Sequence, residues 1–160
     1  MLFRSDLTRR DCFDHVLARL DALLSEHAVS YVKWDMNRPL VQASGADGKS
    51  SAHGFTGAVY QLFDELRRRH PTVEFESCSS GGGRIDMEIL RRVERFWTSD
   101  NNDAVDRQLI QRGASMVMPP EVLGTHVGPS PAHSTGRRID MAFRTTTALF
   151  GHMGVESDVT

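Results

Sequence analysis

Two aspartates each follow an apolar run that has the pattern of a β-strand. Asp35 comes after Tyr31-Val-Lys-Trp, and Asp100 ends the run Val93-Glu-Arg-Phe-Trp-Thr-Ser-Asp. If the two strands are parallel, their carboxyl ends lie at the same edge of a sheet, so both carboxylates face a common site. A pair of carboxyls can divide the roles of nucleophile and proton donor. The pattern therefore favours an enzyme.

The residues around each aspartate predict different roles. Lys33 lies two positions before Asp35 and shares its face in a strand. A nearby cation keeps a carboxylate ionised, which a nucleophile requires. Asp100 has no adjacent cation and follows aromatic residues that end in Trp97. Such a setting suits a group that must hold a proton. Asp103 remains an alternative for this second role.

Other chemistries fit the sequence less well. Cys78 opens the loop Cys-Ser-Ser-Gly-Gly-Gly, but no histidine lies in a neighbouring motif to activate it, and an isolated cysteine is usually a small buried apolar residue. The glycines lack the Lys-Ser/Thr of a phosphate-binding loop. The seven histidines contain no i, i+4 pair on a predicted helix, so we expect no metal and no cofactor.

Composition sets the broad class. The 160 residues are 39% hydrophobic and 25% charged, with a net charge of −2. This balance is ordinary for a globular domain and argues against nucleic-acid binding. The sequence has no apolar run of about 18 residues and no signal-peptide pattern, so we expect no membrane partner. Two cysteines are too few for a disulfide framework and favour the cytoplasm.

Strand-like and helix-like segments alternate along the chain. Apolar spacing predicts helices over 11–29, 56–70, 84–92, 103–114 and 139–150, the first capped by Thr8 or Asp11. Strands are predicted over 29–35, 72–77, 93–98 and 115–118, with a fifth beginning at Gly151, and loops over 39–52 and 119–137.

This alternation predicts an α/β fold with parallel strands, either an open doubly wound sheet or a (β/α) barrel. A barrel places function at the C-terminal ends of several strands, where Asp35, Cys78, Asp100 and the loop after Met118 are expected. An open nucleotide-binding sheet would have its glycine-rich turn after the first strand. We therefore expect a TIM-type barrel, with four to five of the eight βα units.

Three motifs carry a family resemblance. Lys33-Trp-Asp-Met-Asn-Arg, Cys78-Ser-Ser-Gly-Gly-Gly-Arg and Trp97-Thr-Ser-Asp-Asn-Asn-Asp resemble the signature motifs of family 36 glycoside hydrolases, the retaining α-galactosidases and their raffinose-synthase relatives. The resemblance covers essentially the whole chain. It implies a single domain over residues 1–160 that corresponds to the middle-to-late portion of a (β/α)8 catalytic domain, from the helix before the fourth strand to the start of the eighth.

The resemblance also implies an activity: cleavage of terminal α-linked galactose from oligosaccharides such as melibiose or raffinose by double displacement. Asp35 matches the nucleophile and Asp100 the acid/base. The positions that match galactose-binding residues are Lys33, Asn37, Cys78, Gly81 and Trp97. One departure is visible, because Asn102 stands where the family pattern has threonine; it leaves the catalytic assignments unchanged.

Two further functions stay open. A galactosyl transferase of the raffinose-synthase type would share the glycosyl-enzyme intermediate. A non-catalytic or self-associating barrel fragment would keep the motifs without the full pocket. Because a partial barrel leaves strand edges unpaired, we expect a homo-oligomer.

Overall fold

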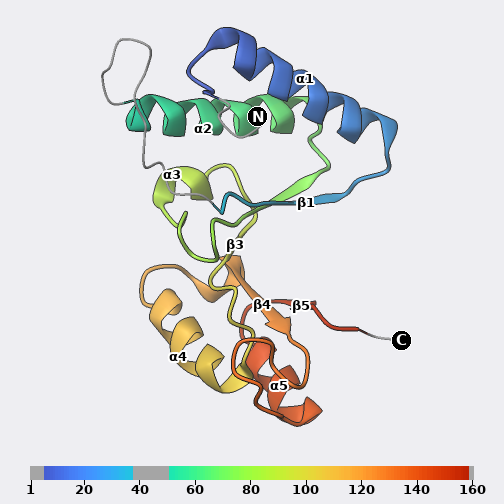
Figure 1. The fold of residues 1–160 in the computed structure, drawn as a ribbon, viewed down its shortest axis with the longest axis vertical. Helices are drawn as coiled ribbons and strands as arrows, with labels where there is room; N and C mark the ends of the chain where they lie inside the picture. The colour runs from blue at the N-terminus through green and yellow to red at the C-terminus, as the bar shows by residue number, and fades with distance from the viewer. Residues whose placement is uncertain (1–5, 38–50, 159–160) are drawn as a thin grey trace. The chain divides into compact units, whose positions relative to one another are not determined.

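The computed structural model describes residues 6–37 and 51–158 (Figure 1). These residues form two compact units. The first comprises the described residues up to Val32 and residues 51–74, and the second comprises Lys33–Asn37 and the chain from Phe75 onwards. All the candidate site residues therefore lie in the second unit. The predicted loop 39–52 falls almost entirely outside the described residues.

Two amphipathic helices make up most of the first unit, α1 (Arg10–Glu26) and α2 (Ala52–Arg69). Their apolar residues recur every three or four positions, so each helix has one apolar face, and the two helices pack together. The buried residues of these faces are Phe13, Leu17 and Leu24 on α1 and Ala58, Val59, Leu62, Phe63 and Leu66 on α2. Both predicted helices are confirmed, with α2 beginning at Ala52 rather than at residue 56.

The predicted cap of α1 is wrong. The residue that precedes the helix, Arg9, has extended backbone and makes no side-chain cap. Thr8 donates its hydroxyl to Asp6 at 2.6 Å, and Asp11 pairs with Arg9 at 2.7 Å. Neither predicted residue therefore occupies the cap position, which is Arg9.

Five strands form one parallel sheet in the order β1-β2-β3-β4-β5. They are β1 (Tyr31–Trp34), β2 (Glu74–Ser77), β3 (Arg95–Trp97), β4 (Leu123–Val127) and β5 (His152–Val155). A doubly wound sheet reverses its strand order at a switch point, whereas a barrel adds each strand beside the previous one. The observed order is that of a barrel, and five strands make up part of one.

Short helices connect the strands of the second unit: α3 (Met87–Leu90), α4 (Ala104–Ser115), the 3₁₀ turn η1 (Pro120–Val122) and α5 (Met141–Ala148). An aspartate caps each of the three α-helices, namely Asp86, Asp103 and Asp140, whose side chains accept backbone N–H groups of the first turn. The three predicted helices are confirmed, although α3 and α5 are shorter than expected. No helix among the described residues is long and apolar enough to cross a membrane.

The predicted fourth strand is wrong. Ser115 ends α4, and the next two residues, Met116 and Val117, are 78% and 65% exposed in a turn. The strand is instead Leu123–Val127, inside the predicted loop 119–137. Close packing of the strands accounts for the glycine at position 124, because a Cβ there would lie 2.9 Å from the Phe96 carbonyl oxygen of the adjacent strand. The loop at the C-terminal end of this strand therefore begins after Val127, not after Met118.

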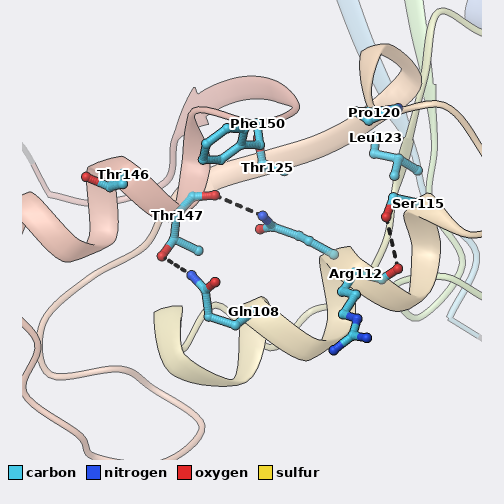
Figure 2. A pocket seen from close by; sticks show the side chains of 10 residues that line it. Gln108, Arg112, Ser115, Pro120, Leu123, Thr125, Thr146, Thr147 and Phe150 are labelled. Atoms are coloured by element: carbon cyan, nitrogen blue, oxygen red, sulfur yellow. Dashed lines mark hydrogen bonds between the residues drawn. The ribbon is translucent and has the colours of Figure 1, made fainter.

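A cavity of about 320 Å³ lies between α4, α5 and the start of β4 (Figure 2). Two glutamine side chains cross it: Gln108 donates to the hydroxyl of Thr147 at 2.7 Å, and Gln111 donates to the Thr147 carbonyl at 2.8 Å. Leu123, the first residue of β4, also lines the cavity. This hollow is therefore at the N-terminal end of the strand, opposite the end at which the candidate acids lie.

Candidate active site

The candidate residues follow the C-terminal ends of three adjacent strands. Asp35 follows β1, Cys78 follows β2 and Asp100 lies three residues after β3. The backbone N–H of Cys78 donates to the Trp34 carbonyl at 2.9 Å, which continues the pairing of the first two strands. Since parallel strands end at one edge, these three side chains are delivered to the same edge of the sheet.

The Asp35 carboxylate is exposed and hydrogen-bonded. Asn37 donates its amide to Asp35 Oδ2 at 2.7 Å, and the thiol of Cys78 also bonds to the carboxylate. Burial would raise the pKa of Asp35, but the bonds from Cys78, Asn37 and the backbone amides of Met36 and Ser80 outweigh it and lower the pKa. The group is an anion at neutral pH, as a nucleophile must be.

Cys78 acts as a donor in this arrangement. Its side chain is 1% exposed. Burial, followed by the hydrogen bond to the neighbouring Asp35 anion, raises the pKa of the Cys78 thiol to about 12. The sulfur therefore stays protonated at neutral pH, which disfavours it as a nucleophile.

Lys33 makes different contacts from those that the sequence suggests. Its ammonium lies 4.0 Å from Glu76 Oε1 and 4.1 Å from the centroid of the Trp97 ring. The main influences that lower the Asp35 pKa are hydrogen bonds, so the prediction that Lys33 keeps Asp35 ionised identifies the wrong cause. Its proposed sugar contact remains a prediction.

Asp100 is exposed and is oriented by a neighbouring aromatic residue. The indole N–H of Trp97 donates to Asp100 Oδ1 at 3.0 Å. Trp97 itself is 1% exposed, so its ring packs within the second unit, and its nitrogen fixes one carboxyl oxygen. The expected role of Trp97 as a wall of the sugar site remains a prediction.

Gly81 joins the two loops that carry the candidate acids. It has a φ of +78°, and a Cβ at this position would lie 2.7 Å from Ser99 Cα and 2.9 Å from the Asp100 backbone nitrogen. On the other side, the neighbouring Ser80 donates its N–H to Asn37 Oδ1 at 2.9 Å. A continuous chain of contacts thus runs from Asp35 through Asn37, Ser80 and Gly81 to the backbone of Asp100.

Asp103, the alternative acid, is a structural cap. The side chain is fully buried, and Oδ1 accepts the backbone N–H of Val105 at 2.9 Å and the Arg137 guanidinium at 2.5 Å. Oδ2 accepts the hydroxyl of Thr135. Burial would raise the pKa of Asp103, yet these bonds lower it. A buried carboxylate whose two oxygens are both occupied is poorly placed for proton transfer, so the geometry favours Asp100.

Three residues near these acids were not singled out by the sequence patterns, namely His126, Glu156 and Arg107. His126, in β4, lies 2.9 Å from Glu156 Oε2 through Nδ1, and its ring centroid is 4.2 Å from that of Trp97. Asn102 donates to the same Glu156 oxygen at 3.1 Å. The positions of His126 in β4 and of Glu156 directly after β5 could have identified these two residues, had β4 been assigned correctly. Arg107, on α4, has no such sequence signal.

No metal centre is indicated by the residues that the structure describes. No group of three or more His, Cys, Asp or Glu side chains among them could hold an ion. What remains is a pair of exposed carboxyls, one hydrogen-bonded by a neutral thiol and an amide and the other by an indole. Such a pair can act as nucleophile and acid/base catalyst.

Comparison with known proteins places the chain in a family. The melibiase family model matches residues 3–160. The chain is 57% identical over 148 residues to an α-galactosidase of Escherichia coli and 38% identical over 160 residues to α-galactosidase AgaA of Geobacillus stearothermophilus, covering 92% and 97% of this chain. It spans only 21% and 22% of those relatives' length.

Solved structures agree. The crystal structure of the Geobacillus stearothermophilus enzyme AgaA superposes with a TM-score of 0.91 at 37% identity, over 96% of this chain and 22% of that one. Variants of the same enzyme have been solved in complex with raffinose and with stachyose. The match confirms that the five parallel strands correspond to part of a TIM-type barrel. The chain belongs to the melibiase family, the α-galactosidases of glycoside hydrolase family 36.

Proposed function

We propose that this chain carries the two catalytic carboxyls of a retaining α-galactosidase, with Asp35 as the nucleophile and Asp100 as the acid/base. The observation that carries the proposal is the chain of contacts between them. Asp35 is held as an anion by Asn37 and Cys78, and its loop reaches the backbone of Asp100 through Gly81. The two acids are thus fixed with respect to each other by short contacts within one unit.

The proposed reaction has two steps. Asp35 Oδ attacks the anomeric carbon while Asp100 gives its proton to the leaving glycosidic oxygen, which releases the aglycone and forms a galactosyl ester. Asp100, now a carboxylate, removes a proton from water, the water oxygen attacks the anomeric carbon, and Asp35 leaves. Retaining enzymes need their carboxyls about 5–5.5 Å apart. The proposal therefore requires this separation between the carboxyls of Asp35 and Asp100.

The substrate class rests on family membership together with polar groups near Asp35. Structures of the relative AgaA hold raffinose and stachyose. We propose that Lys33, Asn37, Cys78 and Gly81, with Trp97 behind Asp100, contact or shape the site for a terminal α-galactose. We propose that residues 1–160 correspond to the middle-to-late portion of a (β/α)8 domain. Because the relatives are about five times as long as this chain, the remaining sugar contacts would come from other segments of that domain. The cytoplasmic location stays a prediction from the low cysteine content.

Two alternatives share these observations. Transfer of galactose to a second sugar uses the same intermediate and differs only in the acceptor. A self-associating barrel fragment is favoured by β5, where Met153 and Val155 are 50% and 60% exposed and no further strand pairs with the outer edge among the described residues. A measurement of the mass in solution tests the second alternative, because association through this edge would give a homo-oligomer.

The test uses both the 160-residue polypeptide and the longest natural polypeptide that contains it. Turnover of p-nitrophenyl α-galactoside is measured for the wild type, Asp35→Asn and the control Asp14→Asn, which changes an exposed carboxylate on α1. We expect Asp35→Asn to abolish turnover and Asp14→Asn to keep it. The first galactose released should be the α-anomer by NMR. Turnover that survives in Asp35→Asn, or release of the β-anomer, refutes the proposal.

A further inference from the structure

Arg107 is a buried cation that the proposed reaction leaves without a role. It lies in the first turn of α4, and its side chain is 1% exposed. Its hydrogen-bond acceptors among the described residues are all uncharged oxygens, whereas a fully buried arginine is normally paired with an opposite charge. Burial lowers the pKa of Arg107 to about 10, and the charges of Glu156, Asp100 and Glu76 oppose this fall. The group therefore remains a cation at neutral pH.

The guanidinium instead binds the loop that carries Asp100. Its nitrogens donate to Thr98 Oγ1 at 2.7 Å, to the Asn101 carbonyl at 2.7 Å, to Asn102 Oδ1 at 3.0 Å and to the Ser99 carbonyl. The two carbonyls belong to the residues immediately before and after Asp100. One planar group therefore fixes the main chain on both sides of the proposed acid.

Arg107 also supports the side chain that orients the acid. Its guanidinium carbon lies 4.3 Å from the centroid of the Trp97 ring, and the indole N–H of Trp97 donates to Asp100 Oδ1 at 3.0 Å. A cation over an aromatic face is attracted to the ring. Both the backbone of Asp100 and the donor to its carboxyl thus depend on the position of Arg107.

We propose that Arg107 is a positioning residue that holds the Asp100 carboxyl in the orientation for proton transfer to the leaving oxygen; the inference rests on the proposed role of Asp100. An ammonium cannot replace it, because lysine has one donor nitrogen, whereas the fork of arginine spreads its donors over several acceptors. Arg107→Lys should therefore keep the charge and lose the orientation.

The kinetic test compares two leaving groups in the longest natural polypeptide that contains these residues. An alkyl α-galactoside needs its leaving oxygen protonated, whereas p-nitrophenolate leaves with little help. General acid catalysis contributes about 10²- to 10⁴-fold. We expect Arg107→Lys to lower kcat/KM for the alkyl glycoside by about 10²-fold, mainly through kcat. The loss for the aryl glycoside should be smaller by a factor of at least about 10. Arg112→Lys, on the exposed side of the same helix, is the control.

A second, milder variant tests the same contact in case Arg107→Lys does not fold. Thr98→Val removes a single acceptor of the guanidinium and should give a smaller loss with the same dependence on the leaving group. A direct readout in the 160-residue polypeptide, whose two tryptophans are Trp34 and Trp97, is the NMR resonance of the Trp97 indole N–H, identified by its persistence in Trp34→Phe. It should shift in Arg107→Lys and stay in place in Arg112→Lys.

Equal losses for both leaving groups, or an indole resonance at its wild-type position in Arg107→Lys, overturn the inference. Failure of the proposed function has a different signature, because turnover then survives in Asp35→Asn. The two results are read from different variants and are independent.

Discussion

Replacing Gly81 by alanine tests the contact that joins the two candidate acids. The new Cβ would lie 2.7 Å from Ser99 Cα and 2.9 Å from the Asp100 nitrogen, both of which are backbone atoms that cannot turn aside. The left-handed backbone at a φ of +78° costs a non-glycine residue about 1–2 kcal/mol. Overpacking adds about 1–3 kcal/mol. We expect the free energy of unfolding to fall by about 2–5 kcal/mol in total.

Two other glycines separate these contributions in urea unfolding followed by circular dichroism. Gly136 has a φ of +71° with no atom within 4 Å of an added Cβ, so Gly136→Ala should show the conformational cost alone, about 1–2 kcal/mol. Gly113 lies in α4 in open space, and Gly113→Ala should stabilise by about 0.5–1 kcal/mol. The difference between the losses of unfolding free energy in Gly81→Ala and in Gly136→Ala measures the cost of the clash with Ser99 and Asp100.

The reasoning is refuted if Gly81→Ala destabilises the protein no more than Gly136→Ala does. The same variant should also disturb catalysis, because relief of the clash must displace the backbone of Asp100. At a temperature where Gly81→Ala is still folded, the proposed role of Asp100 predicts that kcat for p-nitrophenyl α-galactoside falls by at least about 10-fold, since small displacements of a catalytic group are costly.

Three further predictions concern other parts of the chain. Asp103→Ala removes the cap of α4 and should lower the free energy of unfolding in urea by about 2 kcal/mol; an unchanged midpoint contradicts the cap. Because burial raises the pKa of Cys78 to about 12 from 9.0, the folded thiol keeps a proton that the unfolded thiol loses. Stability should therefore fall as the pH rises between these values, and iodoacetamide should modify the half-exposed Cys12 first; faster labelling of Cys78 contradicts its burial. Thr147→Val should destabilise by about 0.5–1.5 kcal/mol because the exposed Gln108 loses its hydrogen-bond acceptor (Figure 2), while the exposed Thr146→Val stays within about 0.5 kcal/mol; equal effects refute the role of that bond.

The sequence was sufficient to predict the alternation of strands and helices and the strand ends at which the acids lie. These features depend on local patterns, because an apolar run that breaks into polar residues marks where a buried strand reaches the surface. Asp35 and Asp100 were found in this way, and the resemblance to a family assigned their roles. The caps of α3, α4 and α5 are equally local, since an aspartate before a helix accepts its first amides.

The fourth strand could not be predicted because its stability comes from distant partners. Leu123–Val127 contains a glycine, a threonine and a histidine, which locally favour a loop. In the fold, Thr125 donates its hydroxyl to the Ala148 carbonyl at 2.7 Å, and Gly124 lets β3 approach closely. The apolar run 115–118 looked more like a strand, but its residues end a helix and two of them are exposed.

The electrostatics of the site also depend on distant partners. Lys33 shares a strand face with Asp35, yet its ammonium lies near Glu76 and over the Trp97 ring, both from other strands. Arg107 sits on a helix whose sequence shows no reason to bury a charge. Its acceptors are backbone carbonyls and the amide and hydroxyl oxygens of a loop. Such groups occur in most loops, so the sequence does not indicate that they bind a buried cation.

The meeting of Gly81 with Ser99 and Asp100 involves main-chain atoms, which are the same in every amino acid. Most substitutions in either loop therefore leave this junction untouched. Under the proposed function, side chains nearby can change and alter which sugar is accepted, while the main-chain junction between the two proposed catalytic loops keeps its dimensions. Specificity and chemistry would then evolve separately in this stretch of chain, provided that residue 81 has no side chain.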